Sequence, residues 1–481
     1  MSERGRVGFS RRGVPVLNFL DNTLAVDSPA GQDKGRLENR TGELGSGSNA
    51  MQSVSQICLV GDGPVVLALA ELLTSDRVSY KFTARILVDL FPSESAFLGD
   101  LKKQYQALQQ QEESSIKGGR HSRRVRAEAG VSDTPAAFLS GLEAALNGSI
   151  PVEPRRVLVR QDVLVQNLEE FENDNSRELT QSFVLACSAT AYGAFLDRMH
   201  PYLSEGSTVI LLGAPLFAAY EFKYQLAKRC PGMQVNVLEM DEPFSVAVVQ
   251  QAEGGLARYQ TTPCSRANVA GATLNETRRS LWLASQLCPE IIPASGLIER
   301  ALLDAQSVLR PVFLLSALFG ARVDYLSDVS RLLNRANLSL LVEIEQELSA
   351  LAQAVHSQPV DFARSLREEV DVRSEAQGPV CDVTLAEAIV SIAGRWFAGH
   401  AGLWSYPLAQ QYLALYVGDY LVPLAQLGQL LGVKTEALNS VITLAGAVNG
   451  VDYQTAGRRL PGFGLSRQSV LDMTMSHGLG Y

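Results

Sequence analysis

The chain has 481 residues, of which 46% are hydrophobic and 19% are charged, and its formal net charge is −9 at pH 7. This length and composition indicate a globular protein of about two to three domains. The negative charge argues against a nucleic-acid-binding protein, which would present a basic face. The most apolar run, residues 311–321, is too short to span a membrane, so we expect no membrane segment.

The cysteines and histidines give no sign of a metal site. The six cysteines include no Cys-x-x-Cys pair, and the five histidines lie far apart in the sequence. Cys58 and Cys187 sit inside apolar runs, which is typical of buried, reduced thiols in a cytoplasmic protein. We therefore expect a cytoplasmic protein without a bound metal.

Residues 1–50 have the composition of a tail. They are rich in Arg, Gly, Ser and Asp, and residues 45–48 read Gly-Ser-Gly-Ser, as in flexible linkers. No apolar core of signal-peptide length follows the early arginines. We expect a disordered tail or an added, non-native segment here, and folded structure from residue 51 onwards.

The first folded stretch has the pattern of a dinucleotide-binding turn. Residues 57–60 form an apolar run typical of a buried parallel strand, and Gly61 and Gly63 then allow a sharp turn. Pro64 favours the first turn of a helix, whose unpaired N–H groups attract a pyrophosphate. The third glycine of the usual fingerprint is missing, so a plain tight turn is the alternative. The residues predicted to bind the cofactor here are Gly61, Asp62, Gly63, Pro64 and Val65.

Two later strand ends complete the predicted cofactor site. Residues 84–90 are predicted to form the second strand, and Asp89 either binds the adenosine ribose, which favours NAD, or is a solvated strand-end carboxylate. Residues 183–189 form another apolar run that ends in small residues, where a cofactor would cross the carboxyl end of a strand. The residues predicted to line the cofactor there are Cys187, Ser188, Ala189 and Tyr192.

Strands and helices alternate up to about residue 275. Beyond the strands already named, the predicted strands are 157–165 and 235–238, with a strand and its following loop at 207–215 and short closing strands at 244–250, 256–260 and 268–270. The predicted helices are 98–111, 135–146, 192–199 and 216–229. This alternation predicts a Rossmann-like parallel sheet covered on both faces, over residues 51–275.

Beyond residue 275 the periodicity is helical. The predicted helices are 278–287, 296–305, 311–318, 330–355, 385–398, 407–420, 421–431 and 435–448. We expect an α-helical substrate and dimerisation domain over residues 276–481, with the substrate bound between the two domains. The predicted fold class is therefore α/β, a Rossmann-like sheet domain followed by a mostly helical one.

Four separated stretches resemble the opine metallophore dehydrogenases, the family of staphylopine and pseudopaline dehydrogenases. Their order and spacing fit the chain from residue 51 to its end, as in a remote member. The stretches are Leu59-Val60-Gly61-Asp62-Gly63-Pro64-Val65, Ala186-Cys187-Ser188-Ala189-Thr190-Ala191-Tyr192, Val209-Ile210-Leu211-Leu212 with Pro215, and Leu430-Leu431-Gly432-Val433-Lys434-Thr435.

The resemblance implies a reductive condensation that uses NADPH or NADH. An amino-acid-derived, nicotianamine-like amine would condense with an α-keto acid, and reduction of the imine would give an opine that chelates metals. Such chemistry needs cationic or N–H groups for the keto-acid carboxylate, and a general acid or base. The resemblance also implies a homodimer whose partners are small molecules, and no metal held by the enzyme.

The sequence departs from the family at its catalytic histidine. The family has a His-Pro step opening an apolar helix, and the matching step here is Arg310-Pro311. Arg310 cannot act as a base near neutral pH, but it can hold a carboxylate; the alternative is a surface arginine at a helix start. His400, in a glycine-flanked loop, is the candidate for acid–base catalysis, against a structural or exposed histidine. The predicted catalytic residues are thus Arg310 and His400.

The family's arginine that meets the NADP phosphate is also missing, since Asp89 and Leu90 stand in its place. Arg85, Lys102 or Lys103 would have to substitute for it. Three functions therefore remain open: an NAD(P)H-dependent opine-type dehydrogenase, a non-catalytic homologue that binds a dinucleotide or metabolite, and a two-domain dehydrogenase acting on a hydroxy acid.

Overall fold

A computed structural model places most of the chain beyond residue 54. The predicted site residues Asp62, Asp89 and His400 and the predicted helix 135–146 lie outside the residues that it describes. The described residues are 55–61, 63–75, 82–88, 90, 101–110, 150–152, 157–158, 160–174, 180–250, 258–263, 266–288, 290–371, 384–389 and 404–478.

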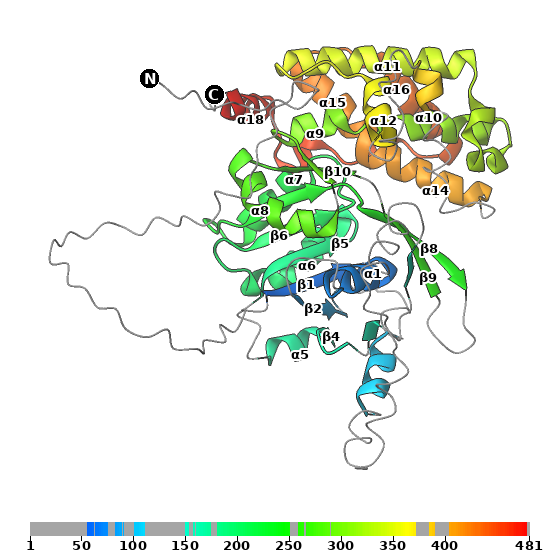
Figure 1. The fold of residues 1–481 in the computed structure, drawn as a ribbon. Helices are drawn as coiled ribbons and strands as arrows, with labels where there is room; N and C mark the ends of the chain where they lie inside the picture. Colours follow the sequence, from blue (N-terminus) through cyan, green and yellow to red (C-terminus); the bar gives the residue numbers. More distant parts are fainter. Residues whose placement is uncertain are drawn as a thin grey trace, which may run out of the picture. The chain divides into compact units, whose positions relative to one another are not determined.

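The centre of the fold is a mostly parallel sheet (Figure 1). Its strand order is β11-β10-β7-β6-β5-β1-β2-β4, and every neighbouring pair is parallel except β7 and β10. The strands are β1 (Ser55–Gly61), β2 (Phe82–Leu87), β4 (Val163–Gln166), β5 (Thr180–Ala186), β6 (Thr208–Leu212), β7 (Asn236–Met240), β10 (Arg266–Gly271) and β11 (Glu290–Pro293).

The chain reverses its direction of strand addition between β1 and β5. From β1 it builds outwards through β2 to β4, and then returns to add β5, β6 and β7 on the other side of β1. This is the strand order of dinucleotide-binding folds, in which the ligand lies at the carboxyl ends of the two strands that flank the reversal. The order therefore places the ends of β1 and β5 at the candidate binding site.

Alternate residues of each strand enter two different cores, as strand geometry requires. Ile57 and Leu59 face one cluster with the helices α1 and α8, whereas Cys58 and Val60 face the other with α6 and α7. The second cluster continues without a break into the C-terminal helices. The helices are α1 (Gly63–Leu73), α6 (Tyr192–Met199), α7 (Ala218–Arg229) and α8 (Leu274–Leu287), and residues 101–110 are also helical.

Several predicted elements differ from the structure. The strand predicted at 157–165 covers only Val163–Gln166, because Val157 and Leu158 are helical. Two of the predicted closing strands do not join the main sheet, but form a separate antiparallel sheet in the order β3-β9-β8. Its strands are β3 (Ile150–Val152), β8 (Phe244–Gln250) and β9 (Arg258–Pro263). In addition, β11 extends the main sheet past residue 275, although no strand was predicted there.

Helices dominate the rest of the described chain, as the sequence predicted. They are α9 (Leu297–Leu303), α10 (Ala305–Phe319), α11 (Arg335–Ala354), α12 (Phe362–Asp371), α14 (Tyr406–Tyr416), α15 (Val422–Leu431), α16 (Glu436–Asn449), α17 (Tyr453–Ala456) and α18 (Arg467–Gly478), beside the short α5 (Leu168–Glu172) in the sheet region. A π-helical segment, Val417–Leu421, joins α14 to α15. The fold class is thus α/β with a helical C-terminal part, while the domain boundary at residue 275 stays a prediction.

One helical stretch among the described residues, Leu297–Phe319, is long and apolar enough to cross a membrane. About two thirds of its most apolar window (65%) is buried inside the protein, and a core helix of a soluble protein passes the same test. The described residues also contain no group of three or more His, Cys, Asp or Glu side chains arranged to hold a metal ion.

Candidate functional site

The predicted turn after β1 lies at the reversal of the sheet. Gly61 pairs with Ala186, the last residue of β5, and its φ of +134° lies in a region that L side chains rarely adopt. A Cβ built on Gly61 would lie 2.1 Å from the carbonyl oxygen of Ala186, so only glycine fits. Gly63, Pro64 and Val65 form the first turn of α1, which begins two residues after Gly61. A strand end followed by the N-terminus of a helix is the arrangement in which unpaired helix N–H groups can meet a pyrophosphate.

The end of β5 offers small side chains to the same edge. Ser188 is exposed, and its Oγ lies 2.6 Å from Oγ1 of Thr190. Cys187 is partly buried, and burial raises the pKa of its thiol to about 12. The thiol is therefore neutral near pH 7 and is no nucleophile. Ala189 is buried at the start of a short 3₁₀ turn, so the segment can line a cofactor but supplies no acid or base.

Tyr192 does not fit a role as a cofactor contact. It begins α6 but has no exposed surface, and its ring packs edge-on against Phe222. Its hydroxyl is buried and has no hydrogen-bond partner among the described residues. Burial raises the pKa of this phenol well above its ordinary value of 10.0. The structure thus places Tyr192 in the core beneath the site and gives the prediction no support.

Arg85 cannot replace the missing phosphate-binding arginine without breaking a buried network. Its side chain is 1% exposed and forms a 2.7 Å ion pair with Asp174. It also donates hydrogen bonds of 2.8 Å to the Oε1 atoms of Gln56 and Gln166. Lys102 pairs with Glu170 at 3.2 Å. Both cations belong to contacts between elements of the sheet region.

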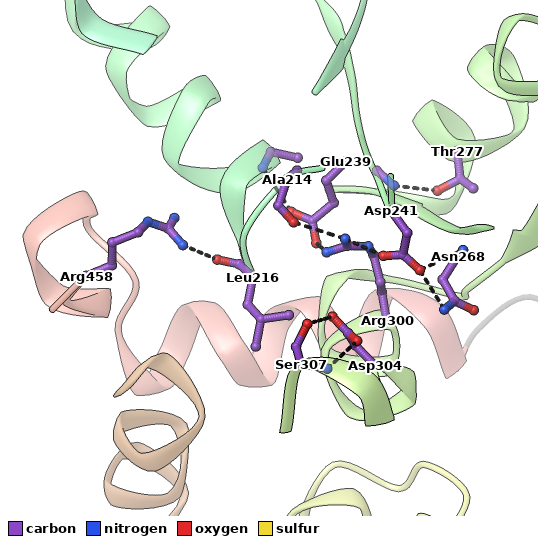
Figure 2. Close-up of polar contacts among 12 residues, drawn as sticks. Ala214, Leu216, Glu239, Asp241, Asn268, Thr277, Arg300, Asp304, Ser307 and Arg458 are labelled. Atoms are coloured by element: carbon purple, nitrogen blue, oxygen red, sulfur yellow. Dashed lines mark hydrogen bonds and ion pairs between the residues drawn. The ribbon is translucent and has the colours of Figure 1, made fainter. Parts of the chain in front are cut away.

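A second group of charged residues lies at the carboxyl ends of β6 and β7 (Figure 2). Arg300, from α9, donates to Glu239 Oε1 at 2.9 Å, to Asp241 Oδ1 at 2.6 Å and to the carbonyl of Ala214 at 3.1 Å. The side chains of Arg300 and Glu239 are 1% and 0% exposed, so both charges are removed from water. Buried ions persist only where partners compensate their lost hydration.

The neighbouring backbone completes this buried charge network. Glu239 Oε2 accepts the N–H of Ala219 at 3.0 Å, and Asp241 Oδ2 accepts the backbone and side-chain N–H groups of Asn268 at 2.9 and 2.7 Å. Burial raises the pKa of Glu239, while Arg300 opposes that rise. Through these contacts Arg300 connects helix α9 to β7, to the segment after β6 and, by way of Asp241, to β10.

Asp304 connects this network to the next helix. It caps α10 by accepting the N–H of Ser307 at 3.1 Å and its hydroxyl at 2.6 Å. Burial, with help from the nearby charge of Asp241, raises the pKa of Asp304, and Arg300 opposes the rise. The backbone N–H of Asp304 donates to the carbonyl of Arg300 at 3.2 Å, so the arginine that pairs with β7 and the cap of α10 lie one helical turn apart (Figure 2).

Arg310 lies inside α10, so the prediction that the Arg310-Pro311 step opens a helix is wrong. The helix begins at Ala305, and Pro311 lies within it. Arg310 is partly buried, donates to Gln306 Oε1 at 2.7 Å, and donates through Nη1 to the hydroxyl of Tyr416. Its guanidinium carbon is 5.3 Å from the centre of the Tyr416 ring. Arg310 is therefore neither a surface arginine nor a helix-start residue.

The Tyr416 ring beside Arg310 belongs to a row of tyrosines that lies near a carboxylate. Tyr412, Tyr416 and Tyr420 follow one face of the α14 region, with successive ring centres 6.3 and 5.9 Å apart. The charge of Glu242, in the segment after β7, acts on both Tyr412 and Tyr416. A Cβ at Gly213, directly after β6, would lie 3.8 Å from Cγ of Glu242. Glu242 thus connects the tyrosines to the carboxyl edge of the sheet.

The structure brings Gly61, Gly63, Cys187 and Ser188 together at the reversal of the sheet, and it places Arg310 on a helix fixed to the ends of β6 and β7. The sequence analysis missed the residues that fix that helix. Glu239 and Arg300 each interrupt an apolar run, and this signal was available. The pairing itself could not be read from the sequence, because it joins residues 61 positions apart.

A strand order that reverses between β1 and β5, a glycine-dependent strand end there, and a helical C-terminal part define a Rossmann-like fold of the α/β class. No protein-family description and no curated protein matches the chain by sequence. Solved structures do match it.

A yersinopine dehydrogenase with NADP⁺ bound has a TM-score of 0.50 and 13% identity, over 88% of this chain and 99% of that one. An octopine dehydrogenase with NADH and L-arginine gives the same TM-score and identity, over 89% and 99%. At this identity the likeness establishes the fold, which is that of the opine dehydrogenases.

Proposed function

We propose that this chain is an NAD(P)H-dependent opine-type dehydrogenase that condenses an amine with an α-keto acid. The observation that carries the proposal is the Gly61 turn against Ala186, in a fold shared over nearly the full length of two dinucleotide-bound opine dehydrogenases. A Cβ at Gly61 would overlap the Ala186 carbonyl, so a glycine is needed for the ends of β1 and β5 to lie this close together. The resemblance to metallophore enzymes extends the proposal to a nicotianamine-like amine.

In this proposal, the chain holds NADPH or NADH through the turn residues Gly61 and Gly63 and the N-terminus of α1, and Ser188 lies beside it. When bound, the reduced nicotinamide supplies a hydride to the imine carbon. Asp89, outside the described residues, is proposed to decide between the two cofactors. Arg310 is proposed to hold the keto-acid carboxylate, because a guanidinium presents its N–H groups in a fork that matches a carboxylate.

The deciding experiment is a titration of the full chain with NADPH and with NADH, followed by nicotinamide fluorescence. Tight binding of one cofactor is expected, and turnover with amine and keto-acid pairs would then complete the test. If neither cofactor changed the nicotinamide fluorescence, even at the highest concentration tested, the proposal would be overturned.

Arg310→Ala tests the carboxylate contact. The loss of a charge-assisted hydrogen bond is expected to raise KM for the keto acid about tenfold or more, with cofactor affinity unchanged. Arg331→Ala is the matched control, because Arg331 is an exposed arginine of the same helical part. Equal keto-acid KM values for the two variants would remove Arg310 from the substrate site.

A non-catalytic, dinucleotide-binding homologue is the second candidate. Arg310 favours it, since the resembled family carries its catalytic histidine at this step. Under this alternative the chain binds NADH or NADPH without turnover, and Arg310→His is expected to introduce activity. Turnover by the unaltered chain would exclude it.

The proposal also includes a cytoplasmic homodimer, again from the resemblance. Apolar side chains that remain exposed on the helical part, namely Phe319, Leu415 and Leu444, are available for such a contact. Light scattering of the purified chain would measure its mass directly, and a monomer at all concentrations would contradict this part of the proposal.

A further inference from the structure

The pair Arg310–Tyr416 joins two helices at the proposed substrate site. Arg310 lies in the middle of α10, and Tyr416 is the last residue of α14 before the π-helical segment Val417–Leu421. π-helical turns are rare and are frequent at functional sites, because they shift side chains out of the regular helical register. Pro423 follows at the start of α15, where its missing N–H favours such an irregular turn.

The hydrogen-bond geometry leaves Tyr416 as a donor. Its oxygen accepts a proton from Arg310 Nη1, so that bond does not use the phenol's own proton. Within the described part of the chain, no acceptor for that proton is found. Tyr416 is 8% exposed, so water reaches little of its surface. A buried donor of this kind needs a partner, and a bound carbonyl oxygen would supply one.

The surrounding charges keep the phenol protonated. Burial raises the pKa of Tyr416 above its ordinary value of 10.0, and Arg310 partly opposes the rise. Glu242, from the segment after β7, and Asp304, from the start of α10, add to it. The rings of Tyr412 and Tyr420 pack against Tyr416 at tilted angles and bring no opposing charge. At neutral pH the group is a neutral proton donor beside a fixed cation.

We propose that Tyr416 is the general acid of this site and that Arg310 stabilises the phenolate that it leaves. This assignment rests on the proposed dehydrogenase function. The uncharged amine adds to the keto carbon, and one of its N–H protons passes to the former keto oxygen. The C–O bond of this neutral adduct then breaks. The leaving oxygen takes the proton of Tyr416 and departs as water, while the nitrogen lone pair forms the C=N bond of an iminium ion. The phenolate recovers its proton from solvent, so one proton is consumed in each turnover.

Tyr416→Phe is the direct test, because it keeps the ring and removes only the hydroxyl. Loss of a general acid is expected to lower kcat about 100-fold or more, with KM for the keto acid little changed. Tyr406→Phe is the matched control on the same helix, since its hydroxyl donates to the backbone carbonyl of Leu318 at 3.3 Å. Thermal unfolding and keto-acid binding, followed by quenching of bound-cofactor fluorescence, are expected to be the same in both variants.

The pH profile separates Tyr416 from a histidine acid such as His400. With Tyr416, kcat is expected to stay constant through neutral pH and to fall only in the ordinary tyrosine range or above, about pH 10. A histidine acid would lose activity as the pH rises through about 6.5. Turnover by the unaltered chain with an undiminished kcat in Tyr416→Phe would overturn this assignment alone. Absence of turnover in the unaltered chain would overturn the proposed function and this assignment with it.

Discussion

The two halves of the sheet's carboxyl edge are built in different ways. At the ends of β1 and β5 the site consists of backbone and small side chains, with Gly61 fitted against Ala186. At the ends of β6 and β7 it consists of buried ions from distant elements, centred on Arg300 and Glu239 (Figure 2). The first half depends on shape, and the second on compensated charge. If a cofactor and a substrate bind along this edge, the backbone would position the cofactor and side chains would position the substrate.

The buried ion pair gives the largest expected effect in this comparison. Arg300→Met leaves Glu239 buried without its cation, which is expected to destabilise the fold by about 3–5 kcal/mol in chemical denaturation. The double variant Arg300→Met/Glu239→Leu removes both charges and is expected to recover much of the loss. If the single and double variants were equally unstable, packing rather than charge would explain the effect.

Gly61→Ala tests whether the half at the ends of β1 and β5 depends on shape. The added Cβ meets the Ala186 carbonyl at a strained φ, with an expected cost of about 2–4 kcal/mol and loss of cofactor binding. Gly206→Ala is the control, because Gly206 has a φ of +80° and no atom within 4 Å of its Cβ position. This control is expected to lose only about 1 kcal/mol and to bind cofactor normally. Unimpaired cofactor binding by Gly61→Ala would show that the turn is not the cofactor site.

A smaller effect is expected where the C-terminal segment meets helix α7. Arg458 pairs with Glu221 at 2.5 Å and donates to the carbonyl of Leu216 at 2.8 Å, directly before α7. Arg458→Ala is expected to cost about 1.5–3 kcal/mol by thermal or chemical unfolding. Arg459→Ala, at an exposed neighbour, is expected to change stability by less than about 0.5 kcal/mol. If both variants lost the same unfolding free energy, the Arg458 contact would not stabilise the half at the ends of β6 and β7.

The smallest effect concerns pH. Burial raises the folded-state pKa of Asp304 above its ordinary 3.8, so its contribution to stability is present at low pH and is lost as pH rises through the folded pKa. Asp304→Asn keeps a helix cap but cannot ionise. The difference in unfolding free energy, variant minus wild type, is therefore expected to increase from pH 3.8 upwards. A flat or falling difference would mean that Arg300 outweighs the burial of Asp304.

Much of the first half could be predicted from the sequence because its signals are local. Strand β1, the glycine turn and helix α1 are consecutive, and the apolar run before Cys187 marks the end of β5 in the same way. Tyr192 shows the limit of this reasoning. Its position after the strand suggested a cofactor contact, but the direction of its side chain depends on how α6 packs against Phe222.

The second half could not be predicted in the same way. Pro311 suggested a helix start, because proline inside a helix removes a hydrogen bond and costs about 3 kcal/mol. The cap at Asp304 and the burial of α10 outweigh that penalty, so the helix begins earlier. The sequence also gave no reason to pair Arg310 with Tyr416, which lies 106 positions away.

The sequence alone determined the class of the fold, the turn at Gly61 and the small residues after β5, since strand and helix periodicity and backbone freedom are properties of short stretches of chain. Tertiary structure decided which buried charges compensate one another, where the helix that carries Arg310 begins, and which tyrosine Arg310 meets. Removing an ion from water is tolerated only where partners from distant elements converge on it, and only the packed chain specifies that convergence.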